Sequence, residues 1–407
     1  MTGGNKRTRE RQGMSAPRTV GVLALALATA AAGGRSARAE QQPAAPEAPA
    51  PAPAAEPAAP PAAESRATEG EATATLAPAL ATTPGRWHGS ILLLDQSATT
   101  QTLHVGGDYQ SYDPTYELWL ALKPRFYLYE TKTDAVSLNL WANLYLELTN
   151  SDTTTRSREP LIGPTFLWAT YGHSFYRSKE TKTVVAIGPR AVLPTDKASR
   201  GSGQLIGVGG LFSASQYLPV RGAGARNLKS ARVGVSAIYN HPFAEATSPV
   251  NDQIRQIRQD VAGRTVISDQ LTGAMNVKHA LSLTASGDLR ILSKLELSLS
   301  YVWLNAWAYA PGASMPIPLL TGPAQPMTVA DPTTYRLSTW TTASLTYEPT
   351  DDFSVSLGYY NLASQLGPDG TRRNPLWSPS ARFFLTLTGN LDVLYDHLAG
   401  HPHATVD

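Results

Sequence analysis

The 407-residue sequence contains no cysteine and no apolar run long enough for a membrane-spanning helix. Without cysteine there is neither a disulfide framework nor a thiolate metal site, so other interactions must stabilise the fold. The eight histidines form no recognisable catalytic motif with a nearby serine or aspartate, so the sequence offers no candidate pair of nucleophile and base. We therefore expect a protein that is not an enzyme and that carries no metal or cofactor.

The N-terminal residues have the pattern of an export signal. Five basic residues up to Arg18 precede the short apolar segment 20–32, and the small-residue sequence Ala37-Arg38-Ala39 follows it. A membrane anchor is the alternative, but no stop-transfer pattern follows, so we predict a cleaved signal peptide over residues 1–39. This segment carries seven Lys/Arg and one Glu, a charge of +6, whereas the whole chain is at +2. The mature chain is therefore at −4, and we expect no nucleic-acid partner.

Residues 40–85 are dominated by alanine and proline, and glutamate is the only charged residue before Arg66. Such a segment has almost no large apolar side chain to bury, so it cannot form a core of its own. We predict a disordered linker in the periplasm, and a tether that binds peptidoglycan or another partner is the alternative. The remaining residues, 86–407, would form the folded domain with a short C-terminal tail.

Apolar and polar residues alternate from about Thr99 onward, which is the two-residue period of a strand with different surroundings on its two faces. The segment 135–148 is the clearest case, with leucines at most even positions and polar residues at most odd positions. This segment is longer than the five or six residues of an ordinary strand and reaches the roughly 9 to 11 residues of a tilted membrane-spanning strand. It therefore predicts a membrane strand.

The same alternation recurs along the chain. Seven further clear segments are residues 116–128, 231–239, 277–286, 294–303, 335–347, 353–359 and 381–395. Four less regular ones are residues 101–111, 161–177, 182–193 and 204–218. The total predicts an all-β fold, a transmembrane antiparallel β-barrel of about twelve strands. A large soluble β-sandwich is the alternative, but it gives no reason for strands of this length.

Short and long connections alternate between these strands, as periplasmic turns and outer loops do in outer-membrane barrels. Only the connection near residues 219–229 is longer than its class predicts. Aromatic residues gather near strand ends, where the headgroup zones of a membrane favour tryptophan and tyrosine. These aromatic residues are Tyr301, Trp303, Trp307, Tyr309, Tyr335 and Tyr347.

With these features, residues 86–395 resemble the general class of Gram-negative outer-membrane β-barrels, in which porin-like channels are found. The resemblance implies an outer-membrane location, contact with outer-membrane lipid and lipopolysaccharide, and insertion by the barrel-assembly machinery. The chain departs from the class by continuing to Asp407 after the aromatic Tyr395, which we interpret as the end of the last strand. The longest outer loop has apolar residues at helical spacing over 251–263, which predicts a short helix that either narrows the channel or covers its mouth.

These observations favour a passive channel for small solutes, whereas a structural or adhesive barrel is the competing function. The polar face of the strands supplies candidate pore-lining residues. They are Glu117, Lys123, Arg125, Asn139, Asn143, Glu147, Arg232, Lys278, Lys294, Glu296, Arg336 and Arg382.

On the inferred inward face, ten basic residues stand against five acidic ones, Glu117, Glu147, Asp288, Glu296 and Asp392. The basic set adds Lys182, Arg190 and Arg290 to the seven lysines and arginines already named. This excess predicts a modest preference for anions.

Overall fold

A computed structural model describes most of the predicted domain. The described residues are 86–100, 115–149, 158–176, 181–220, 228–247, 255–259, 265–269, 275–310, 314–317, 325–328, 334–364, 372–378 and 381–399. The predicted signal peptide, the linker and the strand at 101–111 lie outside them.

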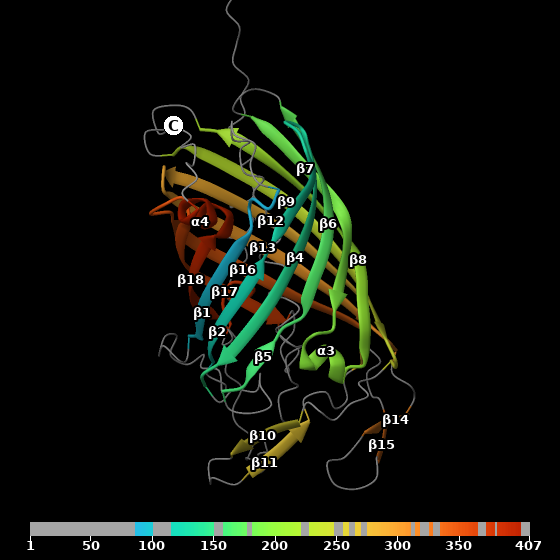
Figure 1. Cartoon of the computed structure of the whole chain (residues 1–407). Coiled ribbons are helices and arrows are strands. Elements are labelled where there is room, and N and C mark those ends of the chain that lie inside the picture. The colour runs from blue at the N-terminus through green and yellow to red at the C-terminus, as the bar shows by residue number, and fades with distance from the viewer. Residues whose placement is uncertain are drawn as a thin grey trace, which may run out of the picture. The chain divides into compact units, whose positions relative to one another are not determined.

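Twelve antiparallel strands form one closed ring (Figure 1). They are β1 (Ile91–Thr99), β2 (Tyr116–Lys123), β4 (Asp134–Glu147), β6 (Thr165–Tyr176), β7 (Lys182–Leu193), β8 (Gln204–Pro219), β9 (Ser230–Ala244), β12 (Val277–Leu292), β13 (Leu295–Ala308), β16 (Tyr335–Tyr347), β17 (Phe353–Ser364) and β18 (Arg382–Asn390). Each strand pairs with the next in this order, and β1 pairs with β18, which closes the ring. The predicted fold class and the number of strands are confirmed.

Two short strands extend members of the ring. Pro124 lies between β2 and β3 (Arg125–Glu130), and both strands pair with β4, so they form one interrupted path along the wall. Similarly, β5 (Pro160–Ile162) pairs with β4 just ahead of β6. Proline has no backbone N–H to donate, which explains why the ladder breaks at Pro124.

The two faces of the wall differ as the alternation predicts. Large apolar side chains such as Leu138, Leu299 and Leu357 are exposed on the outside, as lipid-facing residues are in a chain described without its membrane. Polar residues of the opposite face are buried inside the ring, among them Asn139 and Thr284. The distribution is the reverse of that in a soluble protein, since the apolar side chains are on the outside and the polar ones are on the inside.

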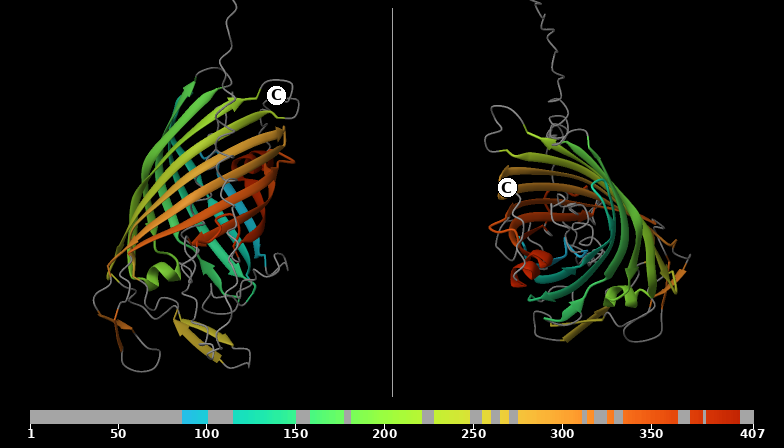
Figure 2. Two further views of the ribbon diagram at one scale, coloured as in Figure 1. Left: turned by 180° about the vertical axis from the view of Figure 1, so that it is seen from behind. Right: turned by 45° about the horizontal axis from the view of Figure 1, so that its top comes forward.

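Figure 2 shows the tilted strands from two further directions, with the ends of the ring well separated. At one end β1 begins opposite the end of β18, since Ile91 pairs with Asn390, and we name this end the termini rim. It carries the short connections, including the turn at residues 293–294 between β12 and β13. The opposite end carries the long connections, and we name it the loop rim. The predicted alternation of short and long connections is confirmed.

Three details of the prediction are wrong. The sequence-based count begins at 101–111 and misses β1, whereas the structure has a strand at Ile91–Thr99. The last strand ends at Asn390 rather than Tyr395, and residues 391–398 form a helix, α4 (Leu391–Leu398). In place of the helix predicted over 251–263, the structure has a hairpin of β10 (Arg255–Gln259) and β11 (Thr265–Asp269). A second hairpin consists of β14 (Ser314–Ile317) and β15 (Gln325–Thr328).

Helix α4 is attached to the termini rim by polar contacts. The amide of Gly89 donates to Oδ2 of Asp392 at 3.0 Å, and Trp87 packs edge-on against Tyr395. His397 Nδ1 lies 3.6 Å from Oδ2 of Asp352 in the turn between β16 and β17. A hydrogen bond from Thr350 and further donors, His397 included, lower the pKa of the Asp352 carboxyl. The carboxylate at this contact therefore stays ionised to lower pH than a free aspartate.

At the loop rim, residues 372–378 cover part of the outer wall. Asn361 of β17 lies on the same side of its strand as the exposed Leu357 but is fully buried, since it donates to the carbonyl of Pro375 at 2.9 Å and accepts from Ser378 at 2.5 Å. Tyr359 donates to the carbonyl of Leu376 at 2.5 Å. The short helix α3 (Lys197–Gly201), capped by Asp196, lies in another connection of this rim. Within the described ranges, no helix has the length and apolar composition needed to cross a membrane.

Candidate functional site

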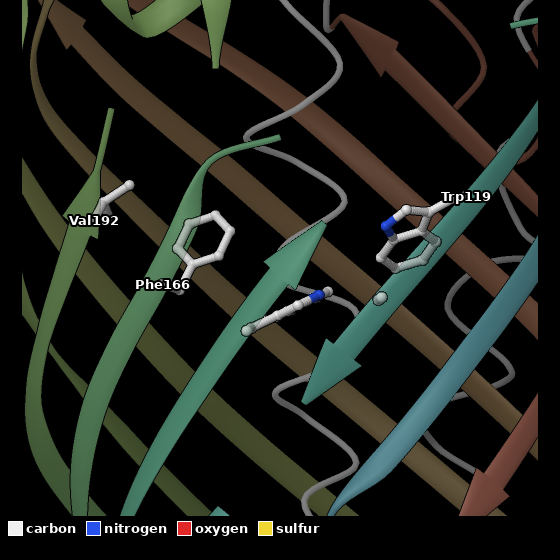
Figure 3. Close-up of a cluster of buried hydrophobic side chains, with 5 residues drawn as sticks. Trp119, Phe166 and Val192 are labelled. Atoms are coloured by element: carbon white, nitrogen blue, oxygen red, sulfur yellow. The ribbon is translucent and has the colours of Figure 1, made fainter. Parts of the chain in front are cut away.

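The inner face of the barrel carries a cluster of aromatic side chains on one arc of the wall. Trp119 of β2, Trp141 of β4, Phe166 of β6 and Val192 of β7 are all buried and pack together with Ala121. Figure 3 draws these five residues as sticks and labels Trp119, Phe166 and Val192. The ring centroids of Trp119 and Trp141 are 5.9 Å apart, and those of Trp141 and Phe166 are 5.7 Å apart. We name this set the aromatic wall.

Strand register explains why the aromatic wall is continuous. Trp141 pairs directly with Phe166, and Phe166 pairs with Val192, so these side chains occupy one row across three strands. Directly paired residues point to the same side of a sheet, which brings their side chains within contact distance. The sequence analysis did not identify this cluster, because it searched the inward face only for polar residues.

Basic side chains lie on the aromatic wall. Nζ of Lys123 is 3.8 Å from the ring centroid of Trp141 and 5.9 Å from that of Trp119. Cζ of Arg190 is 4.5 Å from the ring centroid of Phe166. A cation over an aromatic face is attracted by the ring quadrupole, and this attraction is stronger where water is excluded. The aromatic rings therefore hold both cations inside the barrel.

Arg125 belongs to the same arc but is held by neutral groups. Its Nε donates to Oδ1 of Asn139 at 2.9 Å, and Tyr127 lies next to its guanidinium. Asn139 in turn donates to Ser137 and Thr170, so the amide has a fixed orientation. These hydrogen-bond partners are uncharged, so none of them offsets the field of the Arg125 guanidinium.

Asn143 and Glu147 are buried further toward the loop rim. Oδ1 of Asn143 accepts from the indole of Trp119 at 3.0 Å, and its Nδ2 donates to the carbonyl of Pro164. Glu147 is 2% exposed and accepts from the hydroxyl of Thr149 at 2.9 Å. Both residues are on the inner face, where the sequence analysis placed them.

Other charged candidates form ion pairs inside the barrel. Arg382 Nη1 is 2.9 Å from Glu117 Oε2, and Arg232 Nε is 2.7 Å from Asp288 Oδ2. Arg290 is placed between Glu296 at 3.6 Å and Glu348 at 2.5 Å near the termini rim. Each pair cancels most of the field that its members would produce in the lumen. The count of ten basic to five acidic residues therefore overstates the number of uncompensated charges.

The remaining candidates lie at the ends of the barrel. Lys278 and Arg336 are exposed at the loop-rim ends of β12 and β16. Lys294 is in the turn between β12 and β13, where Nζ donates to the carbonyl of Pro349 at 2.6 Å. Asp392, counted with the inward acids, is in α4 instead. The structure adds one inward acid, Asp95 of β1, which is 6% exposed and accepts from Thr386 at 2.6 Å.

A second aromatic cluster lies on another arc of the inner face, where Val302 of β13, Trp340 of β16 and Tyr360 of β17 pack together. By contrast, the inner faces of β8, β9, β12 and β13 carry small residues. These glycines and serines include Gly209, Ser213, Ser215, Gly234, Ser236, Ser282, Ser286, Ser298 and Ser300. We name this part of the wall the small-residue arc. Because these side chains project little, they fill less of the lumen than the rings of the aromatic wall do.

No family model matches this chain, and no curated protein matches it. Similar solved structures include an outer membrane channel from Pseudomonas putida F1, with 10% identity, coverage of 76% of this chain and 99% of that chain, and a TM-score of 0.44. The NanC porin has 9% identity, coverage of 72% and 97%, and a TM-score of 0.30. The translocator domain of the autotransporter NalP from Neisseria meningitidis has 9% identity, coverage of 81% and 96%, and a TM-score of 0.33. The closed ring of strands and its apolar exterior identify the fold as a membrane β-barrel.

Within the described part of the chain, no three His, Cys, Asp or Glu side chains are grouped as a metal centre would require. The inner face instead combines aromatic rings, cations and small hydroxyl side chains. Groups of these kinds can make transient contacts with a polar solute.

Proposed function

We propose that this chain is a passive outer-membrane channel for small anionic solutes, with the termini rim and the linker in the periplasm. One observation carries the anion preference: Lys123, Arg125 and Arg190 lie on one arc of the inner face. The strand register puts Lys123 beside Trp141. In the next row across the sheet the order is Arg125, Asn139, Trp168 and Arg190, so the two arginines stand at the ends of that row. Three cations in neighbouring rows produce a positive potential, which the low-dielectric wall around the lumen focuses.

A solute path follows from the shapes of the two arcs. The aromatic wall projects into the lumen and carries the cations, while the small-residue arc leaves space beside it. Twelve strands lie between the eight that enclose only packed side chains and the sixteen that leave a wide pore, so a narrow path fits the size of the ring. Serine hydroxyls along the small-residue arc replace part of the hydration shell of a passing anion.

The test is a reversal-potential measurement in planar bilayers under a potassium chloride gradient. We expect the native channel to prefer chloride, and we expect Lys123→Gln with Arg125→Gln to reduce that preference. The matched control is Arg232→Gln with Asp288→Asn, which removes an ion pair without changing the net charge of the lumen. The control should leave the preference unchanged.

Two outcomes would contradict the proposal. A preference for potassium would show that the paired and buried acids dominate the field. A complete lack of conductance from folded protein would favour the alternative, a structural or adhesive barrel whose loops or linker bind partners in the cell envelope.

A further inference from the structure

Two histidines meet on the outer face of the barrel near the loop rim. His241 is on β9 and His279 is on β12, and their Nδ1 atoms are 3.3 Å apart. The ring centroids are 4.9 Å apart at an angle of 37°. The lumen and its proposed function do not involve either residue, because both side chains are on the opposite side of the wall.

Register brings these rings together. Asn240 pairs with Ala280 at the end of the β9–β12 ladder, so the next residue of β9 and the preceding residue of β12 lie side by side. His241 alternates with Tyr239 and Phe243, which are 41% and 46% exposed on the outside. Both histidines are half-buried, so they remain accessible from the membrane–water boundary.

Neighbouring aromatic side chains fix the two imidazoles. Phe243 packs edge-on against His241 with centroids 4.6 Å apart, and the Tyr239 hydroxyl lies 2.7 Å from Nδ1 of His279. His173 of β6, on the outer face near the termini rim, has a different environment. Its Nδ1 is 2.7 Å from a carboxylate oxygen of Asp134, and this contact fixes the orientation of the ring. At His241 and His279, by contrast, the two Nδ1 atoms face each other at hydrogen-bonding distance, and the Tyr239 hydroxyl rather than a carboxylate is the further partner of His279.

Their separation matches the edge of a metal coordination polyhedron. Two imidazole nitrogens that each lie about 2.0–2.1 Å from a zinc ion are about 3.3–3.4 Å apart in tetrahedral geometry. Neutral imidazole is a ligand for copper, nickel and zinc, and affinity in this series is highest for Cu²⁺. The phenol oxygen of Tyr239 lies beside the pair as an additional oxygen donor.

We propose that His241 and His279 form a binding site for a divalent cation of the copper–zinc type, with water completing the coordination. The bound cation would link β9 to β12 across the outer face of the barrel. Because the site exists only when the two strands are paired, the cation binds the folded state and stabilises it. Binding should therefore raise the temperature at which the barrel unfolds in detergent.

The experiment is a titration of the folded, detergent-solubilised full chain with Cu²⁺, followed by electron paramagnetic resonance. We expect one tightly bound Cu²⁺ whose spectrum shows hyperfine coupling to two imidazole nitrogens. His241→Ala and His279→Ala should each abolish this spectrum and the accompanying rise in unfolding temperature. His173→Ala, which changes the corresponding histidine near the other rim, should change neither.

The C-terminal tail contains further histidines, so a second set of variants separates the two sources of binding. Replacing His397, His401 and His403 together should leave the two-nitrogen spectrum intact. The proposal is overturned if the signal disappears with the tail histidines and persists in His241→Ala. It is also overturned if the His241→Ala barrel, shown to be folded by its faster migration on an unboiled gel, keeps the full rise in unfolding temperature.

Discussion

Neighbouring residues of one strand face different solvents in this barrel. Leu299 of β13 is 46% exposed on the outer face, whereas Ser298 pairs with Asp288 on the inner face. A charge therefore has a different cost at each position, although the backbone at both is the same regular strand.

We predict that Leu299→Arg impairs assembly and that Ser298→Arg is tolerated. A lipid-facing arginine costs roughly 2 to 4 kcal/mol near the bilayer midplane, whereas an inward arginine stays in the aqueous lumen. The measurement is the free energy of unfolding by denaturant in lipid vesicles. Equal losses of stability in the two variants would contradict the assignment of inner and outer faces.

Inward positions are not all equivalent, and the sequence could not distinguish among them. Asn139 is 6% exposed and bonded to Arg125, Ser137 and Thr170, so an arginine at this position would displace a polar network and approach another cation. Alternation identifies the side of the wall on which a residue lies. It carries no information about which side chains on that side are in contact, since this depends on the register between strands.

Two adjacent glycines of β8 show how closely neighbouring strands approach. A Cβ atom on Gly209 would lie 1.8 Å from the carbonyl oxygen of Tyr239, whereas one on Gly210 would meet no atom closer than the carbonyl oxygen of Gly188 at 3.4 Å. The first contact is with backbone, which cannot rotate away. The second is ordinary van der Waals contact.

We predict that Gly209→Ala lowers the free energy of unfolding by about 1–3 kcal/mol, because β8 and β9 must separate to admit the methyl group. Gly210→Ala should have little effect. Refolding yield in detergent and the free energy of unfolding would compare the two variants. A Gly209→Ala barrel as stable as the Gly210→Ala barrel would show that the strands tolerate this separation.

At the scale of whole elements, the alternation predicts the bounds of some strands well, including one whose two faces are less regular. The predicted bounds 182–193 and 335–347 agree with β7 and β16. Strand β1 escaped detection because its alternation is irregular: Leu93 contributes to the aromatic wall inside, and Gln96 accepts a hydrogen bond from Tyr116. Its identity as a strand depends on its partners β2 and β18, which are distant in the sequence.

The C-terminal end of the barrel illustrates the opposite error. Leu391, Val393 and Tyr395 continue the two-residue alternation, but β1 begins opposite Asn390, so no strand is available to pair beyond that residue. Residues 391–398 satisfy their backbone groups within a helix instead. The helix predicted over 251–263 is wrong for a similar reason. Ile257 pairs with Ile267 across the β10–β11 hairpin, and the spacing of apolar residues around Ile257 carries no information about this partner.

For the whole molecule, closure is the feature on which membrane residence depends. Strand β1 pairs with β18 from Ile91–Asn390 to Thr99–Arg382 and with β2 on its other side. Without β1, the facing edges of β2 and β18 would present unpaired N–H and C=O groups to hydrocarbon, which costs several kcal/mol for each group. Among the described residues, the ring of strands begins at Ile91.

These two facts give a prediction about which N-terminal residues the barrel needs. A chain beginning at residue 86, refolded from denaturant into detergent, should migrate faster unboiled than boiled, because the closed barrel resists the detergent of the gel. A chain beginning at residue 101 lacks β1 and should show a single, slower band under both conditions. Gel migration with and without boiling measures the result directly. Faster migration of the shorter chain would mean that the ring closes without β1, and loss of the fast band from the longer chain would mean that residues 1–85 contribute to folding after all.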